Sequence, residues 1–346
     1  MSKTENEILN QFDTWNSIYS HLEQYQQLIN KKLLNMEDDT VVVFTGAGTS
    51  GFIGDILEVH LNKKLSTFKY KSIFSTHIVS DSTYINKNSN VLLISFGRSG
   101  NSPESVGAVN KVKERAGKFD QIIITCNKDG SLATTYPNDS IILPPETNDE
   151  GFAMTNSFST MLITAFYIFG VKIDLESVVN NAKHTMNLFN DIPQSGFESI
   201  YFISNNEVEP ILKEYALKIN ELTAGKYNIY SDQILNFRHG PKSSISKKTL
   251  IFLISSNNEY NKKYELDIYN ELLNDENEPI VYLIGNKLDN KCDIEINCAN
   301  ELEKILILLP LIQRYAVKMS TNLSINPDNP NPGGSVNRVV QGVEIY

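Results

Sequence analysis

Two glycine-rich stretches place hydroxyl side chains and an arginine directly after apolar runs. The first is VVVFTGAGTSGFIGD (residues 41–55), with Thr49 and Ser50 after the glycines. The second is VLLISFGRSGNSPES (residues 91–105), whose polar residues are Arg98, Ser99, Asn101 and Ser102. Glycine lets a ligand approach the backbone, and the first amides of a helix, hydroxyls and a guanidinium all donate to anions. If both runs lie in one parallel sheet, the two loops form one phosphate pocket.

Two other interpretations of the first loop remain open. Residues 46–51 fit the dinucleotide pattern GxGxxG, but a single match is weak. The acidic residue that this pattern requires should follow about 20 positions later, and Asp81 comes about ten positions too late. The loop can also be an ordinary strand-to-helix turn. Neither interpretation explains the second loop.

The second half of the chain carries a carboxylate and a histidine suited to proton transfer. Glu221 lies near the end of a helix expected over 207–224, which stops at Gly225. The apolar residues beside it are Ile211, Tyr215 and Leu222. A carboxylate at such a boundary is partly desolvated and suits a general base, although its position alone fits a surface glutamate equally well.

His239 lies in the turn FRHGP (residues 237–241), which presents its side chain instead of burying it. Histidine titrates near neutrality, so it can carry a proton to and from a sugar ring oxygen. An ordinary loop histidine is the alternative. The remaining histidines and the three cysteines, Cys126, Cys292 and Cys298, show no metal-ligand spacing, so we predict no metal.

Alternating strand and helix patterns predict a parallel α/β architecture. The first half has expected strands at 41–45, 73–79, 91–96, 121–126 and 140–143. The second half repeats the pattern at 199–203, 227–230, 249–254, 280–284 and 293–296. Residues 1–38 form a helical segment, with Trp15 in an apolar stripe, and the two domains cover 39–183 and 184–325. Residues 326–346 form a tail with a strand-like end.

Composition excludes several classes of function. The 346 residues carry a net charge of −10, which argues against a nucleic-acid surface and against binding to anionic lipid. No run reaches the roughly 18 apolar residues of a membrane span, and the polar N-terminus has no signal core. Three cysteines without paired spacing fit a reducing compartment, so we expect a cytoplasmic protein.

The loops GAGTS and GRSGNSPES, the stretch ETNDEGFAMTNSFSTM and the turn FRHGPKS together resemble the sugar-isomerase (SIS) superfamily. Within it, the chain is similar to the tagatose-6-phosphate ketose/aldose isomerase family, also described as galactosamine-6-phosphate deaminase/isomerases. The resemblance runs from about residue 40 to the C-terminus. It implies two tandem SIS domains, each a flavodoxin-like, five-stranded parallel sheet sandwiched by helices, in dimers or tetramers with shared active sites.

The resemblance also implies roles for single residues. The phosphate falls to Ser50, Ser99 and Ser102, with Thr49, Arg98 and Asn101 in the same loops. Phe152 and Thr155 resemble residues that line the sugar. Glu221 matches the proton-transfer base, and His239 matches a ring-opening histidine donated by the neighbouring subunit. The resemblance implies no cofactor.

The chain departs from the related glucosamine-6-phosphate synthases in two ways. Where they have a lysine near the C-terminus, this chain has Gln341, with Arg338 close by. It also has no glutamine-hydrolysing domain, which favours the direction that releases ammonia. The expected reaction is therefore galactosamine 6-phosphate to tagatose 6-phosphate and ammonia. The alternatives are plain isomerisation of tagatose 6-phosphate and a non-catalytic sugar-phosphate regulator. Such a regulator usually lacks the acid–histidine pair.

Overall fold

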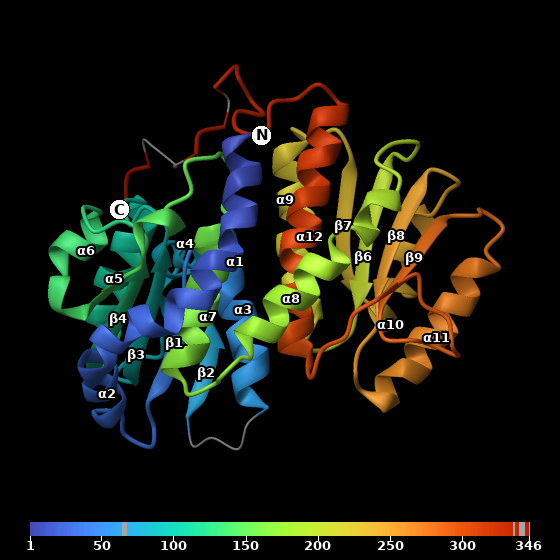
Figure 1. Cartoon of the computed structure of the whole chain (residues 1–346). Coiled ribbons are helices and arrows are strands. Elements are labelled where there is room, and N and C mark those ends of the chain that lie inside the picture. Colours follow the sequence, from blue (N-terminus) through green and yellow to red (C-terminus); the bar gives the residue numbers. More distant parts are fainter. Residues whose placement is uncertain (64–67, 335, 339–342, 346) are drawn as a thin grey trace. The chain divides into compact units, whose positions relative to one another are not determined.

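A computed structural model describes residues 1–63, 68–334, 336–338 and 343–345 (Figure 1). The chain forms two compact units. The N-terminal unit comprises Leu9–Lys172 with Pro332–Tyr346, and the C-terminal unit comprises Ile173–Asn331 with Met1–Ile8. The sequence pattern placed this boundary near residue 184. In the structure, the whole of helix α8 (Leu175–Thr185) belongs to the C-terminal unit, where it packs on α12 (Glu301–Asn322).

The N-terminal unit is built on five parallel strands in the order β2-β1-β3-β4-β5. Their bounds are β1 Val41–Thr45, β2 Lys69–Ser72, β3 Asn90–Gly97, β4 Lys118–Thr125 and β5 Ser140–Ile142. The helices that follow these strands are α3 (Thr49–Asn62), α4 (Ser75–Ser80), α5 (Pro103–Arg115), α6 (Ser131–Thr135) and α7 (Asn156–Ile168). The central strand β3 is almost wholly buried, as expected for a parallel sheet covered on both faces.

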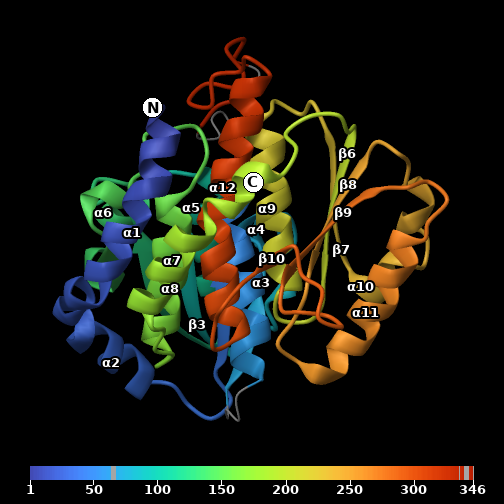
Figure 2. The same ribbon diagram turned by 45° about the vertical axis from the view of Figure 1, so that its right-hand side comes forward.

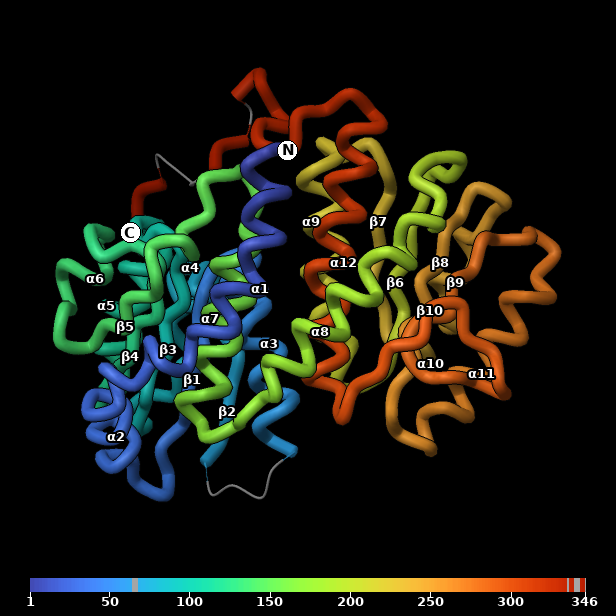
Figure 3. The backbone as a smooth tube through the Cα atoms, in the orientation of Figure 1, coloured from blue at the N-terminus to red at the C-terminus, as the bar shows by residue number. Residues whose placement is uncertain are grey.

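The C-terminal unit repeats this plan with the order β10-β9-β8-β6-β7, again all parallel (Figure 3). Its strands are β6 Ser199–Ser204, β7 Asn228–Gln233, β8 Thr249–Ile254, β9 Ile280–Gly285 and β10 Ile294–Glu295. Figure 2 shows α9 (Glu209–Leu222) and α12 on one face of this sheet, and α10 (Ile234–Phe237) and α11 (Glu259–Leu273) on the other. Two parallel five-stranded sheets flanked by helices confirm the predicted fold class.

The strand predicted over residues 73–79 is wrong. Strand β2 ends at Ser72, and helix α4 begins at Ser75. The reason is that β2 is an edge strand of sequence KYKS, with both lysines exposed, so it lacks the apolar run that identifies a buried strand. The apolar residues that follow are instead buried in a turn and a helix, at Ile73 and Ile78.

The N-terminal helices α1 (Lys3–Leu22) and α2 (Gln26–Leu34) confirm the expected helical segment. Trp15 is fully buried and its indole N–H donates to Ser159 Oγ at 3.0 Å, which confirms a packing role for this residue. None of the described helices is both long and apolar enough to cross a bilayer.

Candidate active site

The two hydroxyl-rich loops follow neighbouring strands of the N-terminal sheet. Strands β1 and β3 are paired in parallel, with Thr45 opposite Ser95. Both loops therefore leave the same carboxyl-terminal edge, which is where open α/β sheets bind their ligands.

The first loop depends on glycine geometry. Gly48 has φ +54°, a conformation that side chains with a Cβ rarely adopt. A Cβ on Gly46 would lie 2.6 Å from the carbonyl carbon of Ser50, so only glycine permits this close turn into α3. Thr49 and Ser50 begin α3 and are largely buried, at 4% and 5% exposure. The loop thus places the N-terminus of a 14-residue helix, which begins with two hydroxyl residues, at this edge of the sheet.

The second loop holds a buried cation next to hydroxyls. Arg98 is 6% exposed, and its Nη2 donates to the carbonyl oxygen of Arg338 at 3.0 Å. Ser99 Oγ accepts the backbone N–H of Asn101 at 3.2 Å, and Ser102 precedes Pro103 at the start of α5. Proline at the first helical position presets the backbone without losing a needed donor. The loop therefore combines a positive charge with the N-terminus of a helix.

A second layer of contacts fixes this loop. Asn101 Oδ1 accepts from the backbone N–H and hydroxyl of Ser131 at 2.8 and 3.0 Å, and Asn127 Nδ2 donates to the carbonyl oxygen of Ser99 at 3.0 Å. These bonds tie the Arg98–Ser102 loop to the start of α6. The side-chain oxygen of Asn101 consequently serves the fold, while its exposed amide nitrogen remains available for a ligand.

A buried carboxylate fixes the third segment at this edge. Asp149, 1% exposed, accepts from the N–H and hydroxyl of Thr155 and from those of Ser157, as well as from the N–H of Asn156, at 2.5–3.0 Å. It satisfies the first amides of α7, which would otherwise attract an anion. Asp149 thereby fixes the loop in between, which contains the half-buried Phe152.

Thr155 is fully buried and its hydroxyl donates to Asp149. Its side chain therefore supports the loop in the described chain, and a direct sugar contact stays a prediction. Met154, from the same loop, brings its sulfur within 3.9 Å of Ser50 Oγ. This contact joins the third segment to the first loop.

The tail contributes Arg338 through its backbone, as described above, while its side chain is exposed. The side chain of Ile345 packs against Gly107 of α5, because a Cβ added to this glycine would lie 3.1 Å from Ile345 Cγ2. Gln341 lies outside the described residues. No strand occurs in the described residues of the tail end, 336–338 and 343–345.

In the C-terminal unit, Glu221 belongs to a charged cluster on α9. Lys218, fully buried, lies 2.5 Å from Glu221 Oε2 and 3.5 Å from Glu214 Oε1. Glu214 is also fully buried, whereas the Glu221 side chain is 26% exposed. A buried lysine is costly unless it is paired, so the two carboxylates and the ammonium form a unit. Glu221 is the carboxylate of this unit that reaches solvent.

His239 is exposed in a turn that ion pairs hold to α11. Its backbone N–H donates to the carbonyl oxygen of Asn236 at 2.8 Å. On either side, Arg238 lies 2.9 Å from Glu271, and Lys242 also pairs with Glu271. The hydrogen bond from Lys242 lowers the pKa of Glu271, with Arg238 adding to the effect. The imidazole is thus presented from a braced turn, as its sequence predicted.

Sequence reasoning missed Lys218, Glu214 and Asp149. The first two had a detectable signal, because Glu214, Lys218 and Glu221 follow helical spacing of four and three residues. Asp149 had none that separates it from neighbouring acidic residues.

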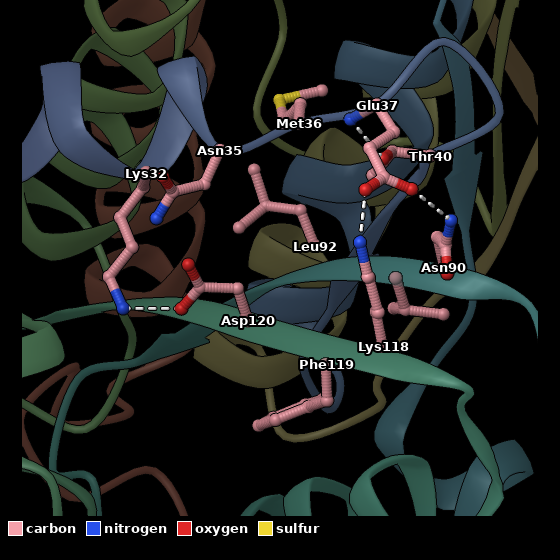
Figure 4. A pocket seen from close by; sticks show the side chains of 11 residues that line it. Lys32, Asn35, Met36, Glu37, Thr40, Asn90, Leu92, Lys118, Phe119 and Asp120 are labelled. Carbon is pink, nitrogen blue, oxygen red and sulfur yellow. Dashed lines mark hydrogen bonds and ion pairs between the residues drawn. The ribbon is translucent and has the colours of Figure 1, made fainter.

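A cavity of about 220 Å³ lies at the opposite edge of the N-terminal sheet, where β3 and β4 begin (Figure 4). Its charges are paired within the wall: Lys32 with Asp120, and Lys118 with Glu37. Among the described residues, no group of three or more His, Cys, Asp or Glu could hold a metal ion. The carboxyl-terminal edge therefore remains the stronger candidate for binding an anion.

Known proteins resemble this chain over most of its length. The sequence model of the SIS domain matches residues 35–169. D-galactosamine-6-phosphate deaminase AgaS of Shewanella sp. (strain ANA-3) is 36% identical over 88% of this chain and 81% of its own length. AgaS of Escherichia coli is 31% identical over 99% of this chain and 95% of its own length. The crystal structure of tagatose-6-phosphate ketose/aldose isomerase from Escherichia coli matches with a TM-score of 0.87 and 29% identity, over 100% of this chain and 96% of that chain.

Proposed function

We propose that this chain converts galactosamine 6-phosphate to tagatose 6-phosphate and ammonia. The premise is its family: the chain belongs to the SIS (sugar isomerase) superfamily and, within it, to the tagatose-6-phosphate ketose/aldose isomerase and galactosamine-6-phosphate deaminase family. The chain is an enzyme of the sugar-phosphate isomerase or deaminating isomerase class. A phosphorylated sugar as substrate fits an enzyme that works in the cytoplasm.

The observation that carries this proposal is the pair of loops at the ends of β1 and β3. The phosphate would accept hydrogen bonds from Thr49, Ser50, Ser99 and Ser102 and a charge-assisted bond from Arg98. Helices α3 and α5 both begin here, and their N-termini favour a dianion. Because the contacts to the phosphate do not change during reaction at C1 and C2, this pocket serves to hold and orient the substrate.

Glu221 is the proposed base. In the open-chain sugar it takes the proton from C2, the electron pair forms the C1–C2 double bond of an enolamine, and the C1 oxygen takes a proton from water. Return of the C2 proton to C1, with loss of an N–H proton from the amine to water, gives a C1 hydroxymethyl group and a C2 imine. Water then adds to the imine carbon, and ammonia leaves to give the ketone. Lys218 lies 2.5 Å from Glu221 Oε2 and so holds the carboxylate in place.

His239 is the proposed ring-opening group, which moves the proton between the anomeric hydroxyl and the ring oxygen. The exposed position of this imidazole in the single chain fits donation to the site of a second copy. We therefore propose a dimer or tetramer with shared active sites. No nucleic acid or membrane takes part in this scheme.

Two other functions use the same residues differently. A plain ketose–aldose isomerase would interconvert tagatose 6-phosphate and its aldose without loss of an amine. A regulator would bind the sugar phosphate without turnover. The Glu214–Lys218–Glu221 cluster favours catalysis, because a binding site for a phosphate monoester gains nothing from an added carboxylate.

Incubation with galactosamine 6-phosphate, glucosamine 6-phosphate and tagatose 6-phosphate, followed for ammonia and ketose, tests the proposal. We expect ammonia and tagatose 6-phosphate in equal amounts from the galacto substrate. Turnover of tagatose 6-phosphate alone would establish the plain isomerase. Binding without turnover of any of the three would establish the regulator.

A further inference from the structure

The repeated fold gives the C-terminal unit its own pair of loops at the ends of β6 and β8. These loops, residues 205–208 and 255–258, correspond by strand order to the phosphate loops of the N-terminal unit. Here a side chain of the protein itself takes the donors. Glu265 of α11 is fully buried, and its carboxylate accepts the Ser256 N–H at 3.0 Å and the amide of Asn205 at 3.2 Å.

The hydrogen bonds continue from Glu265 toward the His239 turn. Asn205 Oδ1 accepts from Gln233 Nε2 at 3.0 Å. Gln233 Oε1 in turn accepts the backbone N–H of Asn236 at 2.9 Å and so caps the short helix α10. The carbonyl oxygen of Asn236 then accepts the backbone N–H of His239 at 2.8 Å.

The donor-to-acceptor direction of this series of hydrogen bonds is fixed at both ends. The Glu265 carboxylate only accepts, and the backbone N–H of Asn236 only donates. Each amide between them has one donor and one acceptor end, so Asn205 and Gln233 can satisfy both ends in only one orientation. Replacement of the acceptor at Glu265 by a donor therefore disrupts the hydrogen bond from the Asn236 N–H to Gln233 that caps α10.

Burial raises the pKa of Glu265, and the bonds from Ser256 and Asn205 oppose that rise, together with the charge of Lys304. Lys304 is itself fully buried and donates to the carbonyl oxygen of Ser255 at 2.6 Å. The buried carboxylate is thus supported by donors on both loops.

We propose that Asn205 and Gln233 are positioning residues for His239, with Glu265 setting the direction of the hydrogen bonds that orient its turn. The proposal rests on the proposed role of His239 in ring opening. In this proposal the two loops of the C-terminal unit bind no substrate and instead hold the His239 turn in place. The topology that binds substrate in one unit then holds an acid–base residue in the other.

A reversal of polarity tests this proposal. Gln233→Glu leaves two acceptors facing each other, and Glu265→Gln ends in two donors facing each other at the α10 cap. The double variant restores a complete chain that runs the other way. The new carboxylate at position 233 accepts from Asn236 and Asn205, and Asn205 accepts from the new amide at position 265. Gln194→Glu is a matched control outside the chain, at a residue whose side-chain oxygen accepts from Asn322.

We expect each single variant to lower kcat on galactosamine 6-phosphate by about 10- to 100-fold, as for a displaced catalytic group, with the affinity for inorganic phosphate unchanged. Amide hydrogen exchange at His239 should accelerate in both single variants. In the double variant, kcat and the exchange rate at His239 should recover to within about threefold of the parent values. In the control Gln194→Glu, both should stay within the same range. Wild-type kcat in the single variants, or a double variant as impaired as the product of the two, would overturn the proposal.

Hydrogen exchange separates this proposal from the proposed function. If exchange at His239 follows the predicted pattern but the parent enzyme does not turn over any sugar phosphate, the reaction assignment fails and the positioning chain stands. If the parent enzyme is active and exchange at His239 does not respond in either single variant, the positioning chain fails alone.

Discussion

Lys218 Nζ lies 2.5 Å from Oε2 of Glu221, and this lysine is fully buried whereas the carboxylate reaches solvent. The ammonium group is thus a fixed internal partner that holds a partly exposed carboxylate in one orientation. Removal of one partner from a buried pair leaves an uncompensated charge, which costs about 3–5 kcal/mol. The pair therefore contributes both to the stability of α9 and to the orientation of the proposed catalytic base.

Lys218→Met should lower both stability and kcat. The methionine fills the volume of the lysine stem but leaves the buried Glu214 carboxylate without its ion pair. We expect destabilisation of about 3–5 kcal/mol, measured by urea unfolding, and a fall in kcat. Glu214→Gln with Lys218→Met should recover much of the stability but not the kcat. Recovery of both would show that Lys218 acts only through the fold.

Arg98→Lys should weaken phosphate binding. Lysine keeps the charge but loses the planar fork that donates to the Arg338 carbonyl oxygen and to a phosphate together. We expect a rise in KM of about tenfold with a smaller change in kcat, because the phosphate contacts are the same in ground and transition states. Arg115→Lys, on the last turn of α5, is the control. An unchanged KM in Arg98→Lys would remove Arg98 from the pocket.

Asp149→Asn should loosen the loop that carries Phe152. The carboxylate accepts from three backbone N–H groups and two hydroxyls at the start of α7, and an amide can satisfy only some of them. We expect destabilisation of about 1–3 kcal/mol by thermal unfolding, and a higher KM for the sugar phosphate than for the parent enzyme. Asp174→Asn, at the exposed cap of α8, should have a smaller effect. Equal effects would mean that Asp149 is an ordinary cap.

The ion pairs that Glu271 makes on either side of His239 contribute a stability that depends on pH. The hydrogen bond from Lys242 lowers the pKa of Glu271, so its contribution is present above the ordinary pKa of glutamate and is lost as pH falls through the lowered value. Glu271→Gln should therefore be less stable than the parent protein at pH 7, and the difference should shrink below about pH 4. Urea unfolding between about pH 3 and pH 7 measures this. A difference independent of pH would contradict the ion-pair origin.

The sequence predicted the alternation of strands and helices because buried parallel strands are continuous apolar runs, as at Val91–Phe96. It failed at β2, where an edge strand is polar and the apolar residues after it form a helix. It also placed both glycine- and hydroxyl-rich loops correctly at strand ends, since such residues mark turns. Their roles in binding stay predictions.

Partners distant in the sequence could not be predicted. The hydrogen bonds from Glu265 through Asn205 to Gln233 join α11, the loop after β6 and the end of β7, and no local sequence pattern couples these residues. Asp149 is similar, because other acidic and amide residues lie within the same stretch and only the fold selects one as the cap. Local spacing reveals helical clusters such as Lys218 with Glu221, and tertiary hydrogen bonds require the structure.

The most direct test of the account is the rate at which galactosamine 6-phosphate loses its C2 hydrogen, followed by proton NMR in D₂O. With the parent enzyme we predict exchange at C2 together with formation of tagatose 6-phosphate. With Glu221→Gln the exchange should slow by about 10²–10⁴-fold while the substrate still binds. Exchange at the parent rate in Glu221→Gln would contradict the assignment of Glu221 as the base.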